Sequence, residues 1–139
     1  MLGAKLGHEA GKVTAQTVVR SRLNPLESPR METTFRATGT LLGVDETDTV
    51  TFWTVVRPDG TVYGEGQGIV MGIGPRLETA TFLGQGVGTI QEDGTISYRG
   101  ATYYQSSTPK WSRLNKIAAV FELEVSPTGK TKSANWEWK

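Results

Sequence analysis

The chain contains no cysteine and only one histidine, and both shortages exclude whole classes of function. Without cysteine there are no disulfides, no thiolate nucleophiles and no cysteine-ligated zinc. The one histidine, His8, lies in the glycine-rich segment MLGAKLGHEAGK, so we expect residues 1–12 to be a flexible leader. A Ser-His-Asp triad, a Cys-His dyad and a multi-histidine metal site are therefore excluded. We expect no metal and no cofactor.

The chain also lacks an excess of charge of either sign and any long apolar run. Fifteen Lys and Arg residues balance fourteen Asp and Glu residues, so the net charge of +1 gives no field that attracts nucleic acid. No segment approaches the ~18 apolar residues of a membrane span, and the first residues lack the apolar stretch of a secretion signal. We expect no nucleic-acid or membrane partner and a cytoplasmic location.

What the sequence does contain is a series of short β-rich runs separated by turns. Its 139 residues are enough for one core, so we expect a single domain over 1–139. Three connections end in glycine after Asp or Thr, which is typical of three-residue hairpin loops. Successive antiparallel hairpins predict an all-β fold, an eight-stranded, mostly up-and-down barrel. The candidate strands are 13–20, 31–42, 49–57, 61–71, 77–90, 95–105, 116–125 and 131–138.

Two connections do not follow the hairpin pattern. Residues 21–30 contain two prolines, and residues 106–115 include the segment PKWSRL, 109–114, which could form one helical turn. This second connection could cover an opening of the barrel or simply cap a turn.

Glycines recur with period two in GEGQGIV, residues 64–70, and in LGQGVG, residues 83–88. A phosphate-binding loop needs G-x-G-x-x-G or G-x-x-x-x-G-K-[ST] leading into a helix, and neither spacing occurs. Period two is the period of a strand, so we interpret the two segments as facing strands of one hairpin. A turn centred on Arg76 predicts that Gly68 faces Gly84.

These strands divide their side chains between an apolar face and a polar face. Three-residue loops would place Val56 beside Val62 and Ile90 beside Ile96. The apolar face then carries the glycines together with valine, isoleucine, phenylalanine and tyrosine side chains. The polar face carries Trp53, Glu65, Gln67, Gln85, Arg99 and Tyr103.

The polar face has two interpretations. It could be a solvated outer surface with ordinary cross-strand pairs. It could instead line the lumen, where buried charges and amides need partners and would mark a small-molecule site. We favour the lumen because Trp53 and Tyr103 are costly to expose, and Glu65 and Arg99 would then pair across Val87. The glycine face would pack outside against another copy of the chain, which predicts a homo-oligomer.

The polar face supplies the candidate site residues. Glu65 or Glu122 could act as an acid or base, and Arg99 could stabilise an anion. Glu122 alternates with apolar neighbours, so it could join this cluster or, the interpretation we prefer, point to solvent. Four aspartates, at 45, 48, 59 and 93, are expected in turns, where aspartate bonds locally. The predicted ligand-binding residues are Trp53, Gln67, Gln85, Arg99 and Tyr103.

Several motifs together resemble a family of uncharacterised bacterial proteins with an allene-oxide-cyclase-like barrel: GEGQGIVM, LGQGVG, YRGATYYQ, RLN, AVFELEV and WEWK. The likeness covers residues 62–139, fits 31–57 loosely and does not extend to the first thirty residues. It implies an eight-stranded antiparallel barrel, often oligomeric. The plant enzyme shapes a reactive fatty-acid epoxide in an apolar barrel with few polar groups. No catalytic residue of that enzyme matches this chain, so its activity is not carried over.

Two functions stay open. The first is a barrel that binds a small, partly hydrophobic molecule and that could also be an isomerase or cyclase. The alternative is a non-enzymatic oligomeric structural or interaction protein whose barrel is filled by its own side chains. The two differ in whether the barrel contains a lined cavity.

Overall fold

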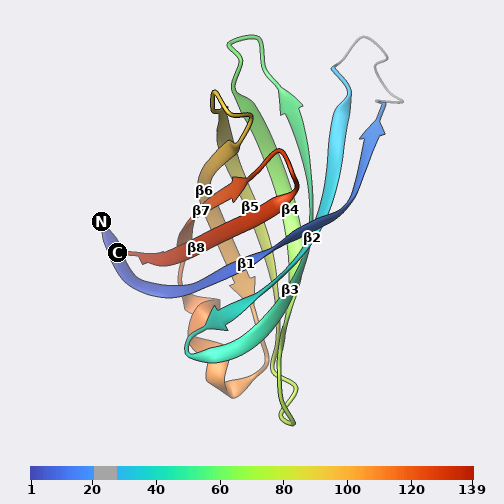
Figure 1. The fold of residues 1–139 in the computed structure, drawn as a ribbon. Coiled ribbons are helices and arrows are strands. Elements are labelled where there is room, and N and C mark those ends of the chain that lie inside the picture. Colours follow the sequence, from blue (N-terminus) through green and yellow to red (C-terminus); the bar gives the residue numbers. More distant parts are fainter. Residues whose placement is uncertain (21–27) are drawn as a thin grey trace.

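The computed structural model describes residues 1–20 and 28–139, which form a closed barrel of eight antiparallel strands (Figure 1). Neighbouring strands in the chain are neighbours in the barrel, and β1 also pairs with β8 to close the ring. The predicted eight-stranded up-and-down barrel is thus confirmed. The elements are β1 (Leu2–Val19), β2 (Arg30–Leu41), β3 (Val44–Val56), β4 (Val62–Gly72), β5 (Thr79–Ile90), β6 (Ile96–Gln105), the 3-10 helix η1 (Pro109–Lys116), β7 (Ala119–Val125) and β8 (Lys130–Trp138).

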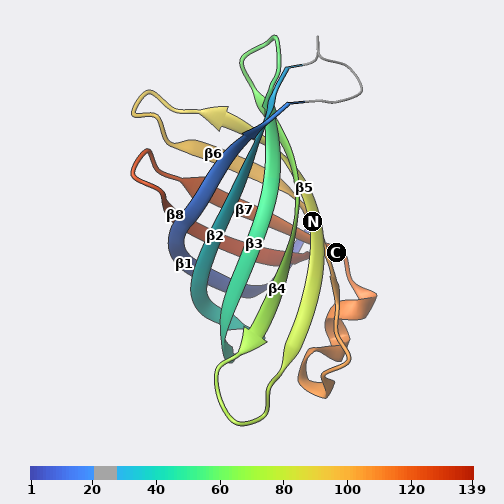
Figure 2. The same cartoon turned by 90° about the vertical axis from the view of Figure 1, so that its right-hand side faces the viewer.

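The predicted flexible leader over residues 1–12 is wrong, because residues 2–12 form the first part of β1. Within this segment Gly7 pairs with Leu41 of β2 and with Asn135 of β8. A Cβ atom at Gly7 would lie 2.1 Å from the Thr40 carbonyl oxygen, so only glycine lets β1 and β2 approach this closely. The strand was missed because glycine stands where an apolar side chain would normally mark the inward face. Figure 2 shows the two chain ends next to each other.

The three glycine-ended loops have the predicted geometry. Gly60, Gly94 and Gly129 have φ values of 85°, 90° and 85°, in the left-handed region that glycine adopts at little cost. In the first loop the Gly60 amide donates to the Arg57 carbonyl at 2.9 Å, and the Arg57 amide donates to the Thr61 carbonyl at 2.8 Å. The irregular connection 21–30 falls largely on residues 21–27, outside the described part of the chain.

The register of the glycine hairpin differs from the prediction by two residues. Gly68 pairs with Phe82 instead of Gly84, because the turn centres on Pro75 instead of Arg76. Its closing bond runs from the Gly72 amide to the Glu78 carbonyl, at 2.8 Å. Both other predicted registers are confirmed: Val56 pairs with Val62, and Ile90 pairs with Ile96.

The glycine-bearing apolar face lines the lumen, and the polar face lies outside, so the favoured assignment of the faces is wrong. The glycines leave room for large rings of neighbouring strands that fold across them. A Cβ atom at Gly68 would lie 2.4 Å from the Phe82 ring, and one at Gly66 would lie 2.6 Å from Cβ of Phe52. The bare centre of this face therefore makes room inside the barrel for aromatic side chains.

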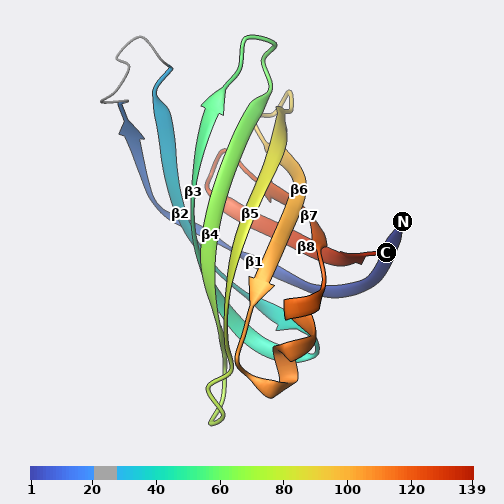
Figure 3. The ribbon, with the colours of Figure 1, turned by 180° about the vertical axis from the view of Figure 1, so that it is seen from behind.

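Two apolar layers occupy the barrel. The first lies against η1, which covers one end of the barrel (Figure 3). There Trp111 and Leu114 are fully buried, and the Trp111 indole donates to the Leu41 carbonyl at 3.0 Å. The helical turn predicted within residues 106–115 is thus η1, which closes this end of the barrel. The second layer contains Phe35, Ala37, Val50, Val62, Tyr98 and Leu123. Among the described residues no helix is long and apolar enough to cross a membrane.

Candidate functional site

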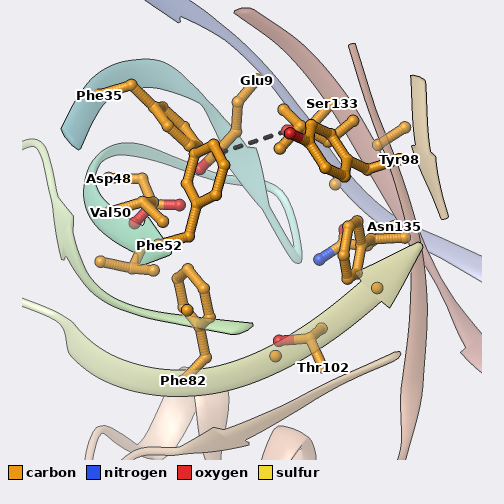
Figure 4. A pocket seen from close by; sticks show the side chains of 18 of the residues that line it. Glu9, Phe35, Asp48, Val50, Phe52, Phe82, Tyr98, Thr102, Ser133 and Asn135 are labelled. Carbon is orange, nitrogen blue, oxygen red and sulfur yellow. Dashed lines mark hydrogen bonds between the residues drawn. The ribbon is translucent and has the colours of Figure 1, made fainter. Parts of the chain in front are cut away.

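A cavity of about 110 Å³ lies inside the barrel, and residues of both apolar layers line it (Figure 4). Its walls are largely aromatic: Phe35, Phe52, Phe82, Tyr98 and Phe121 all contribute. Phe52 makes edge contacts with Phe35 and with Tyr98, at centroid distances of 6.0 Å and 5.7 Å. The cavity is of the same order as the ~150 Å³ apolar cavity that holds a benzene molecule. It can therefore accept a ligand about the size of one ring.

Three carboxyl groups lie together at one side of the lumen. Glu9 comes from β1 and Glu46 and Asp48 come from β3, and their oxygen atoms lie within 4.8 Å of one another. Glu9 and Asp48 line the cavity, where Figure 4 shows both carboxyl groups on the same side. Glu46 is fully buried, and Asp48 is 4% exposed. We call these three residues the acidic cluster.

The prediction that Asp45 and Asp48 lie in turns is wrong, because β3 begins earlier than expected, at Val44. The actual turn consists of Leu42 and Gly43, whose φ values of 48° and 76° are typical of a two-residue hairpin turn. Leucine is rare at positive φ, so the sequence gives little sign of this turn. The available signal is the alternation in ETDTV, residues 46–50, which puts Glu46, Asp48 and Val50 on one face.

The acidic cluster has few partners. Both carboxyl oxygens of Glu46 and Oδ1 of Asp48 are buried without a hydrogen-bond partner among the described residues. Every lysine and arginine in the described part of the chain is exposed, so none compensates the cluster from inside the barrel. Burial, reinforced by the neighbouring Glu9, raises the pKa of Glu46 to about 9 and that of Asp48 to about 10. Both groups therefore keep their protons at neutral pH when the cavity is empty.

Tyr104 from β6 and Asn135 from β8 extend this polar side of the cavity. The Asn135 amide donates to the Tyr104 hydroxyl. Burial, together with the three carboxyl groups of the acidic cluster, raises the pKa of Tyr104 well above its usual range. The Ser133 hydroxyl lies 3.5 Å from Oε1 of Glu9. The cavity is thus amphipathic, with carboxyl, phenol and amide groups on one side and aromatic rings around the rest.

Most of the residues predicted from the sequence lie together, but outside the barrel. Trp53, Gln67, Gln85 and Tyr103 line a depression on the outer face of β3–β6, and Glu65 lies among them. Their predicted place in the lumen is wrong, because alternation puts the glycines inside. Their role in ligand binding stays a prediction.

Arg99 and Glu122 lie away from that depression. Arg99 Nη1 is 3.6 Å from Glu122 Oε1, and the two side chains are 78% and 52% exposed. The predicted pairing of Glu65 with Arg99 is wrong, because the two-residue shift of the glycine hairpin places Glu65 opposite Gln85. Arg99 and Glu122 therefore form an exposed cross-strand pair that points to solvent.

Comparison with known proteins identifies the fold alone. No protein-family model matches this chain, and no curated protein is significantly similar to it in sequence. Among solved structures, a protein of unknown function from Clostridium acetobutylicum is similar with a TM-score of 0.79 and 9% identity, over 97% of each chain. A conserved protein of unknown function from Rhodopseudomonas palustris gives 0.78 and 8%, over 99% of each chain.

A third similar structure is a β-barrel-like protein from Acinetobacter baumannii, with a TM-score of 0.80 and 12% identity, over 100% of this chain and 96% of that one. All three are bacterial, and none has a stated activity. At these identities the likeness supports a shared barrel and carries no function.

Proposed function

We propose that the protein binds a small, partly hydrophobic molecule inside its barrel. The observation that carries this proposal is the cavity of about 110 Å³ with aromatic walls and one polar side. Mostly apolar concave sites with a few convergent polar groups are typical of small-molecule binding. The resemblance to allene-oxide-cyclase-like barrels also favours a hydrophobic ligand, because plant allene oxide cyclase holds its substrate in an apolar barrel.

The alternative, a barrel filled by its own side chains, is less consistent with this cavity. The two apolar layers leave a space between them that is bounded by Phe52 and Phe82 and reached by two carboxyl groups. A purely structural core gains nothing from buried carboxyl groups without partners, because their desolvation is costly. In a ligand site these carboxyl groups would bind polar groups of the ligand.

An isomerase or cyclase would need a proton donor or acceptor in contact with the ligand. Asp48 and Glu9 line the cavity, and the raised pKa of Asp48 keeps its proton available at neutral pH. Any proton transfer would therefore use these luminal groups. Of the catalytic candidates from the sequence, Arg99 and Glu122 form an exposed pair on the outer face and would not touch a luminal ligand. Glu65 borders both the cavity and the outer depression.

We also propose that the chain associates with further copies of itself, through the outer face of β4–β6 instead of the glycine face. The glycine face is inside, but the outer face of β4–β6 exposes apolar side chains between 41% and 63%. Contiguous exposed apolar patches are typical of protein interfaces. We call this surface the outer apolar patch; it consists of Ile69, Met71, Leu83, Val87 and Tyr103.

Native mass spectrometry of the protein purified from its own host tests the luminal proposal. The wild type should retain a small organic molecule that is lost on unfolding. The substitution Val50→Phe, which places a ring in the cavity, should abolish retention, while Val87→Phe on the outer face should not. Equal retention by both variants would contradict a luminal site.

A further inference from the structure

We propose that the ligand carries a primary ammonium group on a small apolar body, and that the acidic cluster binds this group. The inference rests on the proposed luminal binding and names the chemical class of the ligand. Glu9 and Asp48 line the cavity, Glu46 lies beside them, and every lysine and arginine among the described residues is exposed.

The unpartnered oxygens indicate what is missing from the cluster. Glu46 is fully buried on the luminal face, and neither of its carboxyl oxygens has a hydrogen-bond partner within the described ranges. Oδ1 of Asp48 is likewise buried without a hydrogen-bond partner among these residues. The raised pKa values of Glu46 and Asp48 keep both groups protonated in the empty protein. An ammonium group that binds there displaces a proton to solvent, and its positive charge then offsets the cost of the buried carboxylate that forms. The cluster offers acceptors to a ligand that brings both hydrogen-bond donors and positive charge.

The geometry of the cluster suits an ammonium group. An ammonium nitrogen has three N–H donors. Three oxygens that each accept one of them at about 2.8 Å would lie roughly 4.6 Å from one another in tetrahedral geometry. The oxygens of Glu9, Glu46 and Asp48 lie within 4.8 Å of one another. One ammonium group can therefore bridge all three carboxyl groups.

The remainder of the cavity favours an organic cation over a metal ion. On β2 and β4 the neighbours of Glu46 and Asp48 are Ala37, Gly39, Val70 and Gly72, which supply no side-chain oxygen ligands. The buried carboxyl group of Glu78, which packs over Gly72, is one further oxygen group beside the cluster. Calcium takes six to eight oxygen ligands, and magnesium usually keeps several waters. A metal ion would also leave the aromatic part of the cavity unfilled. An apolar body attached to the ammonium group fills it, and rings such as Phe52 and Phe82 attract a nearby cation.

Binding of benzylamine and of its neutral analogue benzyl alcohol to the full chain tests the inference. Measured by isothermal titration or ligand-observed NMR at pH 7.5, benzylamine should bind at least tenfold more tightly than benzyl alcohol. Asp48→Asn and Glu46→Gln should remove this difference and leave benzyl alcohol binding within about twofold, because the amides keep the shape of the cavity. Glu122→Gln, an exposed carboxyl group on the outer face, is the matched control and should change neither affinity.

Each other result has a definite meaning. Equal affinity of the two probes would overturn the ammonium inference and leave luminal binding intact. Binding of neither probe would overturn both. Stabilisation by Ca²⁺ or Mg²⁺ without any by benzylamine would overturn the inference in favour of a metal site. If Glu46→Gln or Asp48→Asn does not fold, Glu9→Gln carries the same test, because Glu9 is only half-buried.

Discussion

At the scale of single residues, Glu46 and Asp48 make the stability of the empty protein depend on pH. Their pKa values of about 9 and 10 in the folded state lie far above the ordinary value of about 4. Between these limits the folded chain keeps protons that the unfolded chain releases, so the free energy of unfolding falls as pH rises. The stabilisation is complete below about pH 4 and is lost progressively towards pH 9.

We therefore expect a lower melting temperature at pH 8.5 than at pH 5.5. Glu46→Gln and Asp48→Asn should each flatten this dependence, and the exposed control Glu124→Gln should not. The other titratable groups around the cluster are Glu9, Tyr104 and Glu78, whose side chain packs over Gly72. A melting temperature that stays constant or rises over this range would contradict the assignment of buried, protonated carboxyl groups.

Among the described glycines, Gly68 lies closest to an aromatic ring, the ring of Phe82. Gly68→Ala should destabilise the protein by about 1–3 kcal/mol, because the new methyl group would lie 2.4 Å from the Phe82 ring. Gly84→Ala is the matched control: its Cβ atom would approach nothing closer than the Ala101 carbonyl oxygen, at 3.2 Å. Urea unfolding of the two variants measures the difference, and equal stability would contradict the packing described here.

At the scale of elements, hairpins with strong turn chemistry could be predicted and others could not. The loops that end in Gly60 and Gly94 fix their registers, because glycine takes the positive φ that the loop requires. The longer connection between β4 and β5 contains Gly74 and Pro75 and follows Gly72, the last residue of β4. Several turn centres are therefore possible, and the predicted register was wrong by two residues. The turn at Leu42 was missed for the opposite reason, since leucine gives no turn signal.

The alternation of faces was predictable, but the inward face was not. Sequence reasoning placed Trp53 and Tyr103 inside because large aromatic residues are usually buried. In this barrel rings from neighbouring strands lie over the glycines and form the walls of the cavity, an arrangement that no single strand reveals. The acidic cluster was missed for a related reason: Glu9 lies in a glycine-rich strand, and its contact with β3 exists only once the barrel closes.

The helix η1 should contribute to stability mainly through Trp111. Trp111→Phe removes the hydrogen bond to the Leu41 carbonyl and shrinks a fully buried ring, which should cost about 1–3 kcal/mol. Trp138→Phe, at a residue that is 63% exposed, should change stability by less than about 0.5 kcal/mol. Similar losses for the two variants in denaturant unfolding would show that η1 is not a plug of the core.

At the scale of the whole molecule, the outer apolar patch should govern self-association. Leu83→Glu places a charge at the middle of the patch and should convert oligomers to monomers in sedimentation velocity experiments. Leu77→Glu lies in the β4–β5 connection, where the side chain is 68% exposed, and should leave the oligomer unchanged. A wild type that is monomeric at tens of micromolar would contradict association through this surface.

The central claim for the whole molecule is that the lumen, and not the outer face, holds the ligand. Binding of benzyl alcohol to three proteins, followed by ligand-observed NMR, tests it most directly. The wild type and Tyr103→Ala, which alters the outer depression, should bind the probe equally, whereas Val50→Phe should not bind it. Loss of binding in Tyr103→Ala with full binding retained in Val50→Phe would contradict the account.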